Sequence, residues 1–193
     1  MQQLFQELEK FSSLSLDTKK ALESIARRRE LPKGYILLHA GGICNYLYFI
    51  EKGITRTFYI KDGKDITDWL SLENTFATSV ISLFTRRPDR RSIELLEDST
   101  IVELPHYELE NLFAKYHDLE RLGRLWSNYG IVQLQQRFDD LHFATAAERY
   151  AKLIQYNPTI LQRVALGIIA SFLGITQETL SRIRSQYSRP DNH

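Results

Sequence analysis

The residues best suited to specific polar recognition lie close together near the end of the chain. They combine hydroxyl, amide, carboxylate and guanidinium groups within one segment of helical spacing: Thr176, Gln177, Glu178, Ser181, Arg182, Arg184 and Ser185. Arginine, glutamine, serine and threonine side chains can form hydrogen bonds with base edges and phosphates in a DNA groove. We therefore predict that this face binds double-stranded DNA.

Two short helices joined by a glycine are expected to position this face. Gly174 can adopt the positive φ that a sharp turn between helices requires, and Thr176 is a good N-cap for the second helix. Apolar residues share one side of each helix, namely Ile169, Ala170, Leu173, Leu180 and Ile183. The pattern predicts a helix-turn-helix whose second helix enters a major groove. An ordinary helical hairpin that contacts no DNA has the same local spacing, so that alternative stays open.

No other group of residues indicates catalysis. The chain has no phosphate-binding glycine loop, no nucleophile elbow and no paired carboxylates at a readable spacing, so we do not expect an enzyme. The single cysteine, Cys44, cannot form an internal disulfide, and the five histidines are scattered without the spacing of metal ligands. We expect no metal site and no cofactor.

Composition places the chain among soluble globular proteins. Hydrophobic residues make up 43% of the 193 positions, which is enough for a packed core. No apolar run approaches the roughly 18 residues that a membrane-spanning helix requires, and the first ten residues are acidic and amphipathic, unlike a secretory signal. We therefore expect a cytoplasmic protein without a membrane partner.

Net charge is only +1, but it is distributed unevenly along the chain. Residues 1–145 carry 19 lysines and arginines against 21 acidic residues, whereas residues 146–193 carry 6 against 3. The positive excess falls in the part that contains the predicted helix-turn-helix. This small excess agrees with an electrostatic contribution to DNA binding.

The first two thirds of the chain predict helices followed by an antiparallel roll. Residues 2–30 have helical spacing, and Arg27-Arg28-Arg29 is expected to be a solvated helix end. Short apolar segments separated by glycine turns then predict strands, and Asp62-Gly63 is a strong hairpin signal. The expected strands cover residues 35–39, 46–50, 54–60, 66–72, 92–96 and 100–104, with a more helical stretch at 76–85.

A long helix is predicted at residues 118–143. Its apolar residues spread more widely than one seam, so one face can pack on its own domain and another on a partner. We predict a homodimer with Leu122, Trp126 and Tyr129 at the interface, although a helix buried in a monomeric core fits the same pattern. The expected units are an effector-type roll at 1–117, the long helix at 118–143 and a DNA-binding domain at 144–193.

Several segments, taken in order, resemble the Crp/Fnr superfamily of bacterial transcription regulators. Residues 31–34, 47–53, 61–64 and 101–104 are similar to strands and turns of the family's roll. Residues 145–153 are similar to the first helix of its DNA-binding domain, and residues 176–183 are similar to its recognition helix. The resemblance covers nearly the whole chain. It implies an α+β fold: an N-terminal antiparallel β-roll of the cyclic-nucleotide-binding-like jelly-roll type with flanking helices, a long dimerisation helix and a C-terminal helix-turn-helix domain.

The resemblance also implies a function and partners. It indicates a homodimeric transcription regulator that reads a palindromic DNA site through residues 176–187, with RNA polymerase as a further possible partner. Gln177 stands where many members of the family have arginine, so the DNA site that it reads is expected to differ.

The implied effector site departs from the family pattern. Cyclic-nucleotide binders of the family use a Gly-Glu pair and a later Arg-Ser or Arg-Thr pair to hold the nucleotide. When residues 83–84 are aligned with the cassette helix of these proteins, Ser79 and Val80 stand at the first pair and Arg90 and Arg91 near the second. Valine cannot accept a hydrogen bond from a ribose hydroxyl. These four residues are the candidate ligand site, and the small-molecule effector is expected not to be a cyclic nucleotide. The alternative is a regulatory module that binds a cyclic nucleotide or another small anion and whose C-terminal hairpin contacts protein.

Overall fold

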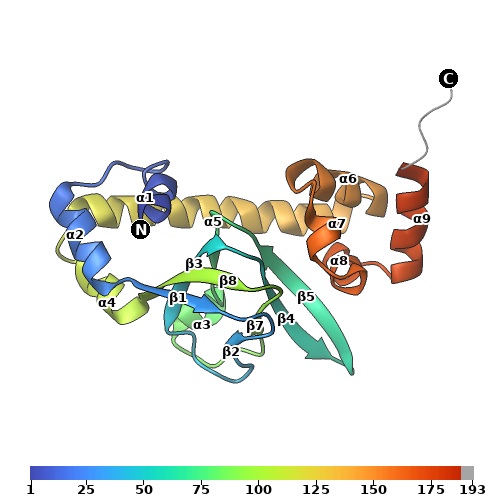
Figure 1. Cartoon of the computed structure of the whole chain (residues 1–193), viewed down its shortest axis with the longest axis horizontal. Coiled ribbons are helices and arrows are strands. Elements are labelled where there is room, and N and C mark those ends of the chain that lie inside the picture. Colours follow the sequence, from blue (N-terminus) through green and yellow to red (C-terminus); the bar gives the residue numbers. More distant parts are fainter. Residues whose placement is uncertain (188–193) are drawn as a thin grey trace.

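The computed structural model describes residues 1–187. Two short helices come first, α1 (Gln2–Leu8) and α2 (Leu16–Ile25), and they pack against one end of a long helix (Figure 1). Ser15 caps α2 by accepting a hydrogen bond from the Thr18 N–H at 3.1 Å. The helical prediction for residues 2–30 is therefore correct only as far as Ile25.

The basic run at Arg27-Arg28-Arg29 begins a strand, not a helix end as predicted. Ala26 is extended, and β1 (Arg27–Leu31) pairs antiparallel with β8 (Ser99–Pro105). Carboxylates on two other strands of the same sheet neutralise the arginines: Arg28 Nε lies 2.7 Å from Oε2 of Glu51, two strands away, and Arg29 Nη1 lies 2.8 Å from Oε1 of Glu103 on the paired strand β8. Cross-strand pairing thus determines a conformation that the local charge pattern does not indicate.

Two four-stranded antiparallel sheets form the roll. Their strand orders are β1-β8-β3-β6 and β2-β7-β4-β5. The remaining bounds are β2 (Ile36–Leu38), β3 (Tyr46–Lys52), β4 (Thr55–Lys61), β5 (Lys64–Ser71), β6 (Phe76–Ala77), α3 (Val80–Thr85) and β7 (Ser92–Leu95). The α+β fold with an antiparallel roll is confirmed. The stretch predicted as helical at 76–85 contains the short strand β6 before α3.

Two turns show why this sequence folds into a roll. Asp62 and Gly63 have φ values of 51° and 72°, and they join β4 to β5 in the hairpin that the sequence predicts. Gly53 lies between β3 and β4 with φ of 107°, and a Cβ atom added there would lie 2.1 Å from Ser99 Oγ. Only glycine fits this close approach to Ser99.

Helices make up the C-terminal half of the chain. They are α4 (His106–Phe113), α5 (His117–Phe143), α6 (Ala146–Tyr156), α7 (Ile160–Arg163), α8 (Leu166–Leu173) and α9 (Gln177–Tyr187). With 27 residues, α5 is about 40 Å long, and it extends from the N-terminal helices to the C-terminal helices (Figure 1). No helix within residues 1–187 is long and apolar enough to cross a membrane.

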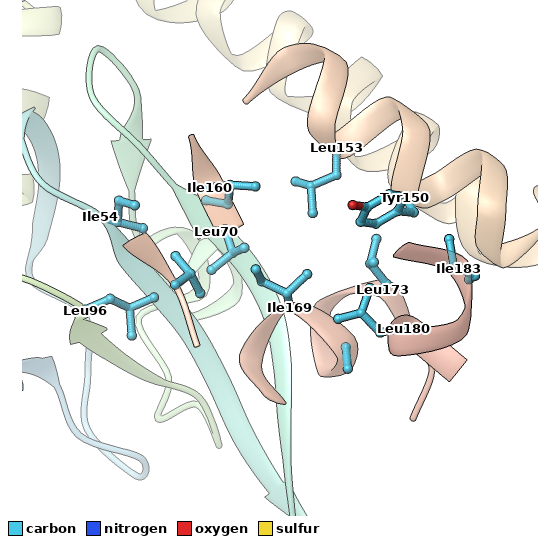
Figure 2. Packing of buried hydrophobic residues seen from close by; sticks show 12 residues of the cluster. Ile54, Leu70, Leu96, Tyr150, Leu153, Ile160, Ile169, Leu173, Leu180 and Ile183 are labelled. Atoms are coloured by element: carbon cyan, nitrogen blue, oxygen red, sulfur yellow. The ribbon is translucent and has the colours of Figure 1, made fainter. Parts of the chain in front are cut away.

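The C-terminal helices do not form a core of their own. One buried cluster contains roll residues Ile54, Leu70 and Leu96 together with residues from α6 to α9 (Figure 2). Thr145 begins α6 with a capping box, as it accepts from the Glu148 N–H at 3.2 Å while the Glu148 carboxylate accepts from the Thr145 N–H at 2.7 Å. The chain therefore turns near the boundary predicted at 144, but apolar packing continues across it. The division into three units stays a prediction.

Candidate nucleic-acid interface

The turn between α8 and α9 has the geometry of a helix-turn-helix. Gly174 adopts φ of 68°, and the Ile175 N–H donates to the Ala170 carbonyl at 3.0 Å, which closes a Schellman-type turn at the end of α8. Ala170 is buried and small. The chain therefore turns sharply between the two helices, as the sequence predicts.

The cap of α9 is also formed. Thr176 Oγ1 accepts a hydrogen bond from the Thr179 N–H at 3.3 Å. Hydrogen bonding to Thr176 lowers the pKa of Glu178, so its carboxylate is ionised in the first turn of the helix. On the inner side, Leu180 and Ile183 are buried against α6 and α8 (Figure 2). The inner side thus holds α9 in place and leaves its other side to solvent.

The residues predicted to bind DNA lie at the cap and on the outer side of α9. All of them are exposed except Arg184, which is half-buried: Thr176, Gln177, Glu178, Ser181, Arg182, Arg184 and Ser185. In Figure 1, α9 lies at the end of the molecule farthest from the N-terminal helices. The structure therefore brings the seven predicted residues together on one accessible helix.

Two of these side chains have defined neighbours. Arg182 Nη2 donates to Thr179 Oγ1 at 3.2 Å, and within the described residues it forms no ion pair with Glu178. The Gln177 amide lies over Gly167 on α8, since a Cβ atom added at Gly167 would be 2.5 Å from Gln177 Nε2. Arg182 is thus held by a neutral hydroxyl group, which leaves its charge available to a phosphate or a guanine.

The positive excess of the C-terminal region is largely used inside the protein. Arg163 pairs with Glu73 and Glu97, Lys152 with Asp140 at 2.6 Å, and Arg149 donates to backbone carbonyls. Arg189 and Asp191 lie outside the described residues. Among the described basic residues of the C-terminal region, α9 carries two, Arg182 and Arg184. Overall charge is therefore a weaker guide to the interface than the position of these two arginines.

The residues predicted for the dimer interface pack mainly within their own chain. Leu122 is 3% exposed in a core formed with α1, α2 and α4, and the Trp126 ring packs against Phe76 at a centroid distance of 5.3 Å. Tyr129 is half exposed, and its ring lies 5.4 Å from that of Phe11. These contacts give little support to Leu122 and Trp126 as interface residues, because Leu122 is buried and Trp126 partly buried within the same chain, and the assignment stays a prediction.

A different side of α5 carries exposed apolar residues. Ile131, Leu134, Phe138 and Leu141 recur at intervals of three, four and three residues and are 43–64% exposed. This is the spacing of positions a and d in a coiled coil. The sequence contains this signal, but the apolar residues earlier in the helix obscure it.

The candidate ligand residues on the roll have partners within the chain. Ser79 is fully buried, caps α3 and donates to Asp89 Oδ2 at 2.5 Å, while Arg91 Nε lies 2.6 Å from Asp68. Burial opposes ionisation of Asp89, but the hydrogen bond from Ser79 and the charge of Arg91 outweigh it and lower the pKa of Asp89. These contacts do not support Ser79 and Arg91 as ligand-binding residues, because their polar groups are already satisfied.

The other two candidates are more accessible. Val80 is 44% exposed at the start of α3, and the Arg90 guanidinium lies 4.4 Å from the Tyr59 ring centroid. Val80 offers no acceptor to a ribose hydroxyl, as its side chain is apolar. Within residues 1–187, no cluster of three or more histidine, cysteine, aspartate or glutamate side chains could hold a metal ion.

Comparison with known proteins agrees with this architecture. Residues 28–116 match the family described as "Cyclic nucleotide-binding domain". The chain is 28% identical over 173 residues to an "Anaerobic regulatory protein" of Pasteurella multocida (strain Pm70), and 26% identical over 194 residues to the "Transcriptional activator protein FnrA" of Stutzerimonas stutzeri. These similarities support a Crp/Fnr superfamily regulator. These matches cover 82% and 92% of this chain.

Solved structures show that the same fold extends over most of the chain. FixK2 from Bradyrhizobium japonicum superposes with a TM-score of 0.70 at 21% identity, over 84% of each chain. The Thermus thermophilus catabolite activator protein superposes with a TM-score of 0.57 at 22% identity, over 94% of this chain and 86% of that one. The chain spans 62% of the length of the Pasteurella protein and 77% of that of FnrA.

Proposed function

We propose that this protein is a homodimeric transcription regulator that binds double-stranded DNA through α9. The observation that carries the proposal is the exposed polar side of α9, on a helix whose opposite side is fixed by Leu180 and Ile183. A hairpin with a merely structural role has no need of arginine, glutamine and serine side chains on one accessible face. Two relatives are named as a transcriptional activator and an anaerobic regulatory protein, which supports the same reading.

The dimer is proposed to form through α5. Leu134 and Phe138 lie at its exposed apolar seam, and two copies of this seam would bury each other in a parallel coiled coil. A twofold dimer would place two copies of α9 on one side of a DNA duplex, in successive major grooves, as a palindromic site requires. The proposed interface thus lies farther along α5 than the sequence predicts.

The experiment is selection of duplexes from random oligonucleotides by the purified chain, followed by fluorescence anisotropy at several salt concentrations. We expect enrichment of a palindrome and an affinity that falls as salt rises, because phosphate contacts release counterions. Arg124→Ala removes one positive charge at an exposed position of α5 far from α9, and it is the control for a general effect of charge on DNA affinity. If no sequence is enriched and no saturable binding occurs at low salt, the proposal fails and a protein-docking role for α9 is favoured.

A further inference from the structure

A cavity of about 530 Å³ lies where the roll, the long helix and the helix-turn-helix unit meet. Trp69 and Leu70 come from β5, Gln133 and Arg137 from α5, and Tyr156 and Phe172 from α6 and α8. Its volume is within the range of small-molecule sites. The candidate residues Ser79, Val80, Arg90 and Arg91 on the roll do not line it.

Arg137 is the notable residue of this cavity. It donates to the Phe172 carbonyl, and its guanidinium lies 4.0 Å from the Phe172 ring centroid. Its Nε atom is buried and has no hydrogen-bond partner among the described residues. Within that part of the chain no carboxylate lies within 4.0 Å of the guanidinium nitrogens. Arg137 is half-buried, and a cation that is partly removed from water with only neutral partners is unfavourable, so an arginine in such a place normally has an anion beside it.

The other charges of the cavity do not supply that anion. Asp140 is the acidic residue of the lining, and it forms an ion pair with Lys152, whose Nζ atom lies 2.6 Å from Asp140 Oδ2. Arg149 adds a second guanidinium, which donates to the Leu173 carbonyl at 2.9 Å. Burial lowers the pKa of Arg137, with Asp68 and Asp140 acting in the opposite direction. The lining therefore carries an excess of positive charge next to an unused donor.

The rest of the lining is largely apolar and aromatic. Trp69, Tyr129, Tyr156 and Phe172 contribute rings, and Leu70, Leu153 and Leu173 contribute aliphatic surface. A bare inorganic ion would leave this surface unused, whereas an anion with a flat apolar part would cover it.

We infer that this cavity binds a small organic oxyanion, whose carboxylate or phosphate pairs with the Arg137 guanidinium and whose apolar part packs against the aromatic wall. Such a ligand compensates the charge of the half-buried guanidinium through a charge-assisted contact. It would contact β5, α5 and α8 together, so its binding would favour the packing of the helix-turn-helix unit on the roll. That regulatory consequence rests on the proposed function, but binding itself does not.

The test is isothermal titration calorimetry on the full chain without DNA. Naphthalene-2-carboxylate is the probe, and naphthalene-2-carboxamide is its neutral isostere. We expect saturable binding of the carboxylate and at least about tenfold weaker binding of the amide, because the amide lacks the charge that Arg137 requires. Phenyl phosphate and cyclic AMP, titrated in the same way, show whether a phosphate serves better than a carboxylate.

Variants locate the site. Arg137→Gln should weaken carboxylate binding by about tenfold to a hundredfold, while Arg124→Gln, on an exposed part of the same helix, should leave it unchanged. Trp69 and Trp126 are the two tryptophans, so ligand-induced quenching that disappears in Trp69→Phe places the ligand in the cavity even where Arg137→Gln fails to fold.

Three outcomes would overturn the inference. They are equal affinity for the carboxylate and the amide, unchanged affinity in folded Arg137→Gln, and no saturable binding of any of the three anions up to about 10 mM. Since the titrations contain no DNA, failure here leaves the DNA-binding proposal standing. Failure of the selection experiment likewise leaves this site intact.

Discussion

Arg163 of α7 binds Glu73 at the turn between β5 and β6, with Arg163 Nη1 3.1 Å from Glu73 Oε2. The same guanidinium pairs with Glu97 at the turn between β7 and β8. Glu73 in addition accepts from the Gly53 N–H at 2.9 Å. One side chain of the C-terminal helices is thereby fixed to two turns of the roll, and Glu73 links it to a third turn at Gly53, next to the shared apolar cluster of Figure 2.

Replacing Arg163 should loosen this attachment. We expect Arg163→Ala to lower the free energy of unfolding by about 1–3 kcal/mol, because Glu73 and Glu97 lose their hydrogen-bonded partner and are left as like charges. Urea denaturation measures the change, and Arg124→Ala is the control. Hydrogen exchange should rise in α7 and α8 more than in the roll. Equal stability of Arg163→Ala and the parent chain would show that the apolar cluster alone holds the helices.

The same contact gives the attachment a pH dependence. Burial opposes ionisation of Glu73, but hydrogen bonds from Arg163 and the Gly53 N–H outweigh it, so its pKa lies below the ordinary glutamate value. The stabilisation is therefore fully present above that ordinary value and is lost as pH falls through the lower pKa of the folded state. Glu73→Gln should flatten the loss of stability on the acid side, as measured by thermal unfolding across a pH series. A slope identical to that of the parent chain would contradict this assignment.

Much of the roll could be predicted because its signals are local. Alternating apolar residues and turns such as Asp62-Gly63 indicate strands and hairpins without reference to the rest of the chain. The strand at Arg27–Leu31 could not be predicted in this way, as its basic residues become favourable only beside Glu51 and Glu103. Pairing between distant segments decides such a strand.

The same distinction applies to the candidate sites. Gly174, Thr176 and the polar side of α9 are neighbours in sequence, so their arrangement follows from local rules. Which side of α5 faces a partner depends on where α1 and α4 pack, and that is a non-local outcome. Arg137 illustrates the limit, since a charged residue on a long helix is ordinarily solvated, whereas Arg137 is half-buried and contacts Phe172 of α8.

The exposed seam of α5 should control assembly. We expect Leu134→Glu or Phe138→Glu to convert the dimer to a folded monomer, since like charges would face each other across the twofold axis. Sedimentation velocity measures the assembly and circular dichroism the fold. Val132→Glu, on the same helix and also exposed but outside the seam, should remain dimeric. Trp126→Ala should instead reduce stability by about 3–5 kcal/mol, because that ring belongs to the core of its own chain. A dimeric Leu134→Glu, Phe138→Glu double variant would place the interface elsewhere.

Arg182 should contribute directly to DNA recognition. It is exposed on the outer side of α9, and its contact with Thr179 engages only one of its donors. If it reads a guanine through O6 and N7, Arg182→Ala should cost about 1–3 kcal/mol on the selected site and relax the sequence preference there, without a change in melting temperature. If it contacts phosphate alone, affinity should fall for all sequences and the salt slope should fall by about one.

Arg182→Lys separates the two modes of contact. Lysine keeps the charge but lacks the planar pair of donors that matches a guanine edge. A base-reading Arg182 therefore predicts that Arg182→Lys retains nonspecific affinity and salt dependence while losing sequence preference, whereas a phosphate contact predicts near-normal binding on every duplex. Anisotropy titrations on the selected duplex and on one with a single substituted base pair distinguish these results. Affinity and salt slope unchanged in Arg182→Ala would remove this side chain from the interface and require a different orientation of α9 on DNA.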